Sequence, residues 1–238
     1  MLSAIAIVPS TPVMIAELAR GVAAEVADLR EAAVAAAAAL PARWVAVGVG
    51  PAQTHVRDDR TGTFAGYGVD IRVTLSPTAS GSPSPMPLCA LIAGWLRCQS
   101  APQARAEVRV YAADYDVDAA LASGRQLRAE LDAAPEAVGL LIVADGANTL
   151  TPPAPGGYDP ASIPVQAALD DALAAGDITA LTHLPEAIVG RAAYQVLAGV
   201  GEPRSAEELY RGAPYGVGYF VGVWLPVGSS EATGVSTR

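Results

Sequence analysis

AVGLLIVADG, residues 137–146, is the clearest buried strand of the chain and decides the fold class. Its apolar run is continuous and β-branched, which is typical of a strand covered on both faces in a parallel sheet. Two earlier runs share this character, Ala4 to Val8 and WVAVGVG at 44–50. Because helix-forming sequence separates the first two runs, the pattern predicts a βαβ unit at the start of the chain.

Helical and extended patterns alternate along the rest of the chain. A long helix is expected from Glu17 to Leu40, since this stretch is rich in alanine and ends at Pro41. The remaining expected elements are a strand at 69–75, a loop at 76–87, a helix around 88–98, a strand around 108–111, a helix capped by Asp116 or Asp118, a long loop after Gly146, helices at 161–175, 177–183 and 185–199, and a strand at 215–227.

These elements predict one α/β domain, residues 1–227, with a mainly parallel central sheet and helices on both faces. Residues 228–238 are expected to form a flexible tail. The first residues lack a basic region and their apolar run stops at Pro9, so no signal peptide is expected. The most apolar tract, at 32–40, is too short to span a membrane, and we expect a soluble, cytoplasmic protein.

The charge of the chain excludes two classes of partner. The net charge is −9, there is no lysine, and the fifteen basic residues are scattered arginines. Nucleic acids and anionic membranes require clustered cations, so neither is an expected partner. Cys89 and Cys98 lie nine residues apart on an expected helix, hence on opposite faces, and are interpreted as two small core residues.

Polar residues at strand ends are the candidate site. Pro9-Ser10, Gly50-Pro51 and Asp145-Gly146 each end an expected strand, and carboxyl ends of parallel strands gather at one edge of a sheet. A pocket is therefore expected there, and the stiff turn Pro9-Ser10-Thr11-Pro12 belongs to it.

Several neighbouring residues allow two interpretations. His55 follows a strand end and is either a site residue or a solvated loop residue. Asn148 is the only asparagine, and it is either a residue that faces a ligand together with Asp145 or one that stabilises a turn. His183 lies between helices and is interpreted as a cap or surface residue. The common signatures of hydrolases, nucleoside triphosphatases and zinc proteins are absent.

As a set, these segments resemble the LigB-type catalytic domain of class III extradiol ring-cleavage dioxygenases, in the branch that includes Memo-like proteins. The family's first strand ends in Pro-His-Pro-Pro, where this chain has Pro9-Ser10-Thr11-Pro12, and its second ends in Ser-Pro-His, where this chain has Gly50-Pro51-Ala52. Its third ends in Gly-Asp-Leu-Ser-His-Arg-Leu, matched here by Ala144 to Leu150. The similarity spans nearly the whole chain and is most specific in PYGVGY at 214–219.

The resemblance implies an iron site that this chain has lost. The family holds Fe(II) with two histidines and a carboxylate, and the matching positions here carry Ser10, Ala52 and Arg211. The family's acid/base histidine is matched by Asn148. A methyl group offers no lone pair and a guanidinium repels a cation, so Ser10 and Thr11 occupy a metal-ligand turn from which the ligand has gone.

Three functions are compatible with this reading. The leading expectation is a LigB-like pseudoenzyme without a cofactor that binds a small aromatic or anionic molecule or a partner protein, with Arg211 recognising a carboxylate or phosphate. The alternatives are an active dioxygenase with Fe(II) or another divalent metal on relocated ligands, for instance Glu17, His55 and Asp145, and a homodimeric scaffold packed through the alanine-rich helix. The expected pocket lining is Ser10, Thr11, Ala52, Gln53, His55, Asp145, Asn148, Arg211 and Tyr215.

Overall fold

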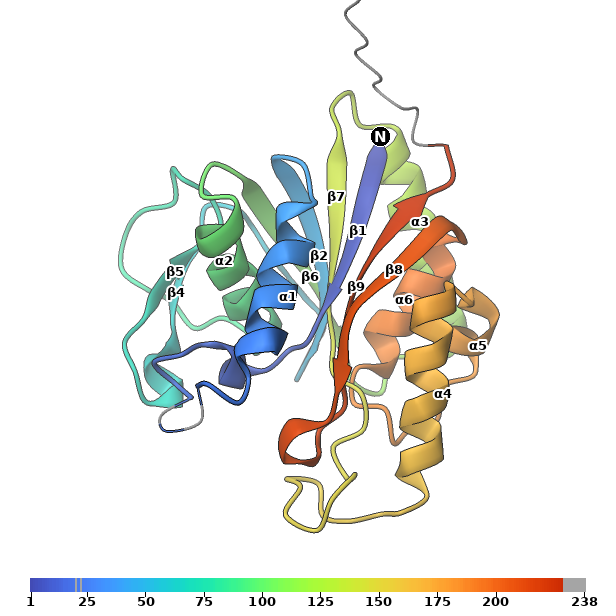
Figure 1. The fold of residues 1–238 in the computed structure, drawn as a ribbon. Helices are drawn as coiled ribbons and strands as arrows, with labels where there is room; N and C mark the ends of the chain where they lie inside the picture. Colours follow the sequence, from blue (N-terminus) through green and yellow to red (C-terminus); the bar gives the residue numbers. More distant parts are fainter. Residues whose placement is uncertain (20, 22, 229–238) are drawn as a thin grey trace, which may run out of the picture.

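The computed structural model describes residues 1–19, 21 and 23–228. Within this part a seven-stranded sheet has the order β3-β6-β2-β7-β1-β9-β8 (Figure 1). Its strands are β1 (Leu2–Val8), β2 (Arg43–Gly50), β3 (Thr54–Val56), β6 (Arg105–Ala112), β7 (Val138–Val143), β8 (Pro203–Gly212) and β9 (Tyr219–Pro226). The three continuous apolar runs of the sequence are its central strands β2, β7 and β1.

The centre of the sheet is parallel and its flanks are antiparallel. β6, β2, β7 and β1 pair in parallel, whereas β3 pairs with β6, β9 with β1 and β8 with β9 in antiparallel fashion. The register sets Val8 and Gly48 both beside Val143, so β1 and β7 end at the same level and β2 continues for two more residues. The expected α/β domain with helices around a mainly parallel central sheet is confirmed.

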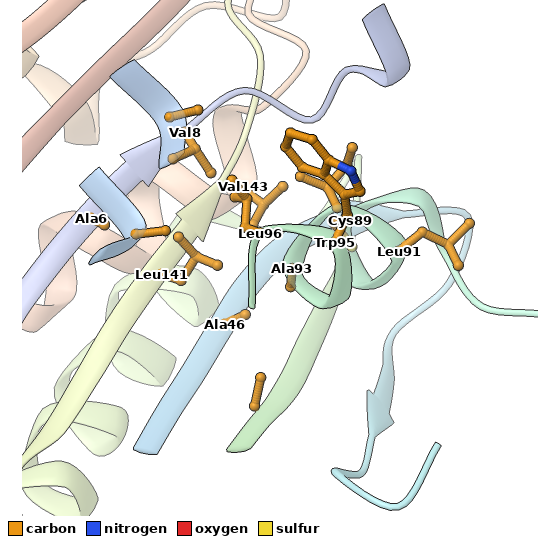
Figure 2. Close-up of a cluster of buried hydrophobic side chains, with 14 of the residues drawn as sticks. Ala6, Val8, Ala46, Cys89, Leu91, Ala93, Trp95, Leu96, Leu141 and Val143 are labelled. Carbon is orange, nitrogen blue, oxygen red and sulfur yellow. The ribbon is translucent and has the colours of Figure 1, made fainter. Parts of the chain in front are cut away.

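Helices cover both faces of this sheet (Figure 1). α1 (Ala27–Ala38) and α2 (Leu88–Ser100) pack on one face, and α3 (Val117–Asp132), α4 (Ser162–Ala175), α5 (Ile178–Thr182) and α6 (Arg191–Val200) lie on the other. Two apolar cores result, one under each layer of helices. Figure 2 shows α2 side chains, including Cys89 and Leu96, above sheet residues such as Ala46 and Val143.

Short elements complete the chain. β4 (Thr61–Thr63) and β5 (Arg72–Thr74) form a separate two-stranded sheet, so the strand expected at 69–75 is shorter than predicted and lies outside the main sheet. Single turns of 3₁₀ helix are η1 (Pro12–Met14), η2 (Phe64–Tyr67) and η3 (Pro214–Gly216).

Several elements differ from the prediction, and the helix expected at 185–199 begins only at Arg191. The helix expected from Glu17 begins only at Ala27, and Gly21 in between has φ of +83°, which an α-helix does not accommodate. The last strand begins at Tyr219, because Tyr215 and Gly216 have positive φ values of 60° and 77° and bend the chain. The strand β8 was not predicted, since most of its residues are exposed and leave no apolar pattern.

Other local expectations are confirmed. The Asp116 carboxylate accepts a hydrogen bond from the Ala119 N–H and caps α3. Both thiols are free and Cys89 lies in the core as expected, but Cys98 is partly exposed, so its interpretation as a core residue was wrong. His183 is exposed at the end of α5. No helix in the described ranges has both the length and the apolar character needed to cross a membrane. The expected tail, apart from Gly228, lies outside the described residues.

Candidate functional site

The level ends of β1 and β7 bring Ser10 and Asp145 together. The Ser10 N–H donates a hydrogen bond of 2.8 Å to Asp145 Oδ1. This contact confirms that these two strand ends meet at one edge of the sheet. It is also the only hydrogen bond from the described residues to the Asp145 carboxyl group, which leaves Oδ2 without a protein donor.

Hydroxyl groups surround the Ser10–Asp145 contact. Thr11 Oγ1 and Tyr219 Oη share a buried hydrogen bond of 3.0 Å, and the buried Tyr194 donates through Oη to the Ala144 carbonyl at 2.9 Å. We call Ser10, Thr11, Asp145, Tyr194 and Tyr219 the aspartate cluster. Four separate parts of the sequence, at 10–11, 145, 194 and 219, supply it.

Burial changes the acidity of the aspartate cluster. Desolvation raises the pKa of Asp145 to about 7, and the single N–H donor of Ser10 lowers it only in part. Burial likewise raises the pKa of Tyr219 to about 12, with the Asp145 charge contributing in the same direction. Near neutral pH the Asp145 carboxyl therefore exchanges between its acid and carboxylate forms, while the tyrosine keeps its proton.

A buried amide holds the chain that follows Asp145. Gln166 of α4 accepts from the Ala147 N–H through Oε1 at 2.7 Å and donates through Nε2 to Asp170 Oδ1 at 2.8 Å. A Cβ atom on Gly146 or Gly218 would lie within 2.1 Å of this amide, so both positions require glycine. Sequence reasoning missed Gln166 and Asp170, because a contact between a helix and a distant loop leaves no local pattern.

Asn148 has a structural role in the loop at 147–161. Its carbonyl accepts from the Gly156 N–H at 2.9 Å. Its side-chain Oδ1 lies so close to Gly156 that a Cβ atom at this position would be only 2.3 Å from it. The turn-stabilising interpretation is therefore the one that the contacts support. No described contact links the Asn148 side chain to Asp145.

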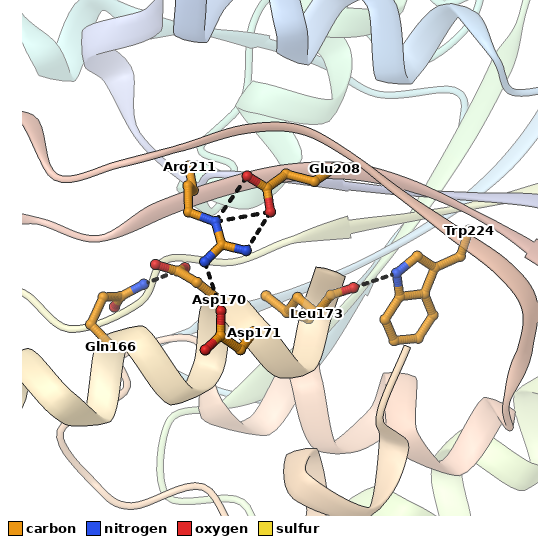
Figure 3. Close-up of polar contacts among 7 residues, drawn as sticks. All are labelled: Gln166, Asp170, Asp171, Leu173, Glu208, Arg211 and Trp224. Atoms are coloured by element: carbon orange, nitrogen blue, oxygen red, sulfur yellow. Dashed lines mark hydrogen bonds and ion pairs between the residues drawn. The ribbon is translucent and has the colours of Figure 1, made fainter. Parts of the chain in front are cut away.

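Arg211 does not offer a free cation. Its Nε and Nη2 atoms donate to Glu208, with Nε 2.8 Å from Oε1, and Nη1 donates to Asp171 at 2.8 Å (Figure 3). The two carboxylates raise the pKa of the guanidinium further above its usual value. The expectation that Arg211 presents its donors to a carboxylate or phosphate is corrected, because two acidic side chains already occupy them.

Tyr215 lies on the surface and fastens η3 to another segment. Its side chain is 41% exposed, and Oη donates to Glu25 Oε2 at 2.7 Å. Its φ of 60° is the one positive value that the structure records for a residue other than glycine, a strained conformation.

His55 lies far from the aspartate cluster. β3 carries His55 at the edge of the sheet, and β6 and β2 separate it from β7, a distance of about 14 Å at roughly 4.8 Å per strand. Ala52 and Gln53 are exposed, and His55 Nε2 lies 3.6 Å from Glu107 Oε2. The residues expected to line a single pocket are therefore divided, because Ser10 and Asp145 meet whereas His55 lies at the sheet edge.

Two clefts adjoin β3, one on each face of the sheet. The α3 side has a cleft of about 420 Å³ lined by Gln53, His55 and residues of β6 and α3. The α2 side has a cleft of about 410 Å³ lined by Thr54, His55, Val56, Arg57, Asp59, Arg60 and two prolines.

The metal ligands of the alternative dioxygenase are not brought together. Among the residues that the structure describes, no three His, Cys, Asp or Glu side chains form a group that could hold a metal ion. The relocated set Glu17, His55 and Asp145 therefore does not form such a group. At the family positions Ser10 offers a hydroxyl and Ala52 a methyl group, so the donor set does not fit Fe(II).

Comparisons with known proteins bear on the fold alone. No protein family and no curated protein matches the chain. Among solved structures, the chain is similar to the crystal structure of the uncharacterized protein JW3007 from Escherichia coli K12, with a TM-score of 0.55 and 12% sequence identity. The match covers 94% of this chain and 99% of that one. The same arrangement of elements therefore occurs in a natural protein of similar extent.

Proposed function

We propose that this protein is a LigB-like pseudoenzyme that lacks the iron centre and binds a small hydroxylated aromatic molecule at the aspartate cluster. The observation that carries the proposal is the Asp145 carboxyl, which has a single protein donor and a pKa of about 7 at the edge where β1 and β7 end. Desolvated carboxyls with few partners are characteristic of functional sites.

The chemistry of the cluster favours a hydroxylated ligand. The Asp145 carboxyl would accept from a ligand hydroxyl when ionised and donate to it when protonated, and no hydrogen bond from the described residues occupies Oδ2. The nearby Thr11 and Tyr219 hydroxyls are themselves donors and acceptors. The aromatic character of the ligand comes from the resemblance to ring-cleavage dioxygenases, whose substrates are catechols.

An anionic ligand is not proposed at this place. Ionised Asp145 would repel it, and the cation expected to compensate, Arg211, is held by Glu208 and Asp171. A homodimer remains a prediction. Ala33, Ala36 and Ala37 of α1 are already buried in the core, which leaves less of the alanine-rich helix for a second copy.

The binding proposal is tested with catechol and phenol as probes, by ligand-observed NMR at pH 8. We expect saturable binding to the wild type and at least a tenfold weaker affinity for Asp145→Ala, because the charge-assisted hydrogen bond to the ligand is lost. Asp114→Ala is the matched control, since Asp114 is an exposed aspartate with no described side-chain partner, and its affinity should be unchanged. Equal affinity in Asp145→Ala would show that the probes bind elsewhere.

A second expectation concerns iron. Protein loaded with Fe(II) under anaerobic conditions and desalted should contain well under one iron per chain and should not open the catechol ring. The reason is that an Fe(II) site of this kind needs three protein donors on one face, and the described residues do not provide them. Metal analysis and an assay for ring opening measure both quantities. Stoichiometric iron with activity that His55→Ala abolishes would favour the dioxygenase alternative.

A further inference from the structure

The cleft on the α2 side of β3 contains cations that have no ionic partner. We call it the β3 cleft; it is about 410 Å³ and is lined by Thr54, His55, Arg57, Asp59, Arg60 and Pro85, among others. In the part of the chain that the structure describes, neither Arg57 nor Arg60 takes part in an ion pair. Arg60 donates through Nη2 to Ser84 Oγ at 2.9 Å, which leaves its Nε and Nη1 donors open.

The β3 cleft differs in charge from two other clefts of the protein. The chain has a net charge of −9, and two other clefts are balanced or acidic. At the amino ends of the strands, Arg43 and Arg105 face three carboxylates, those of Asp58, Glu107 and Glu136. On the α3 side of β3, Arg109 is held in ion pairs by Glu107 and Glu130. The β3 cleft, with two arginines against Asp59, has an excess of positive charge.

Local structure holds the two arginines at one rim. The Arg60 N–H donates to the Arg57 carbonyl across a turn, and the Leu75 N–H donates to the Arg60 carbonyl at 3.2 Å. Ser84, next to Pro85 of the lining, is held beside the same turn, since its N–H donates to the Thr61 carbonyl at 2.9 Å. Pro85 and Pro87 stiffen the backbone of this part of the lining.

We propose that the β3 cleft binds a small organic anion, with a phosphate or carboxylate group held by Arg57 and Arg60. Guanidinium groups bind oxyanions through paired N–H donors, and the Thr54 hydroxyl and the His55 imidazole add further polar groups. The cleft is larger than an anion alone requires, and Val56, Pro85 and Pro87 provide apolar contact for the body of the ligand. This site is separate from the aspartate cluster and does not depend on its function.

Isothermal titration calorimetry at pH 7 and low salt tests the proposal, with phenyl phosphate and benzoate as probes and benzamide, which has no hydroxyl group, as the neutral analogue. We expect both anions to bind more tightly than benzamide, and the affinity to fall as salt is added. The relative affinities of phenyl phosphate and benzoate decide between a phosphate and a carboxylate ligand. Arg57→Gln/Arg60→Gln should weaken binding of the anions at least tenfold.

Two controls keep the outcome specific to the cleft. Arg204→Gln removes an exposed arginine without a described ionic partner from β8, at the opposite end of the sheet, and should leave the affinity unchanged. Asp145→Ala should also leave it unchanged, which separates this site from the proposed phenol site. Circular dichroism verifies that each variant is folded. Absence of binding to the wild type, or equal affinity in the double arginine variant, would refute the proposal.

Discussion

Trp224→Ala is expected to lower the free energy of unfolding by about 3–5 kcal/mol, the range found when large aromatic side chains are removed from a protein core. Trp224 is fully buried in β9, where it pairs with Ile5 of β1 and Ala206 of β8. Its indole N–H also donates to the Leu173 carbonyl at 2.9 Å (Figure 3). Because Leu173 lies in the last turn of α4, this hydrogen bond satisfies a carbonyl at a helix end.

Urea unfolding followed by circular dichroism measures the effect. Trp224→Phe separates the two contributions, since it fills most of the space but cannot donate to Leu173, and should cost about 1–3 kcal/mol. Leu209→Ala, at an exposed position of the neighbouring strand β8, should change stability by less than about 0.5 kcal/mol. A loss below about 1 kcal/mol for Trp224→Ala would contradict the burial of the indole.

Asp145→Asn is expected to stabilise the protein at pH 8 by about 2–4 kcal/mol relative to the wild type, and to have little effect near pH 4. The pKa of Asp145 is about 7 in the folded state and near 3.8 in the unfolded chain. The folded state therefore binds the proton more tightly, and wild-type stability falls as pH rises from about 4 to about 7. Asparagine does not ionise and can still accept from the Ser10 N–H, so the variant avoids this loss.

The measurement is the difference in unfolding free energy between Asp145→Asn and the wild type, taken at several pH values. Comparing the two proteins removes the contribution of Asp170, whose raised pKa of about 6 affects both equally. The exposed control Asp114→Asn should follow the wild type at every pH. A difference that does not depend on pH would show that Asp145 has an ordinary pKa in the folded state.

The sequence predicts those elements of the fold whose burial requires a continuous run of apolar residues. The strands at 4–8, 44–50 and 137–146 were identified because each is covered on both faces and therefore continuously apolar. β8 was missed for the opposite reason, since an edge strand with exposed side chains carries no such pattern. The alanine-rich stretch predicts a helix from Glu17, but α1 begins only at Ala27, because Gly21 has a positive φ that interrupts the helical conformation.

The sequence predicts only those contacts of the candidate site that follow from the shared edge of parallel strand ends. Ser10 and Asp145 were expected to meet, because they follow parallel strands, and they do. His55 was grouped with them by the same rule, but β3 turns back to pair with β6 at the sheet edge, a step that the local pattern does not reveal. The ion pair between Arg211 and Asp171 was equally inaccessible, since Asp171 lies forty residues away in the chain.

The position of β1 has a consequence for synthesis of the protein. β1 leaves the ribosome before the other strands of its sheet, yet its two neighbours in the sheet are β7 and β9, at 138–143 and 219–226. More than half of the chain must therefore be synthesised before a strand that pairs with the apolar segment Leu2–Val8 is available. Such non-local pairing slows folding and leaves an unpaired hydrophobic strand exposed on the nascent chain, which is the kind of segment that chaperones protect from aggregation.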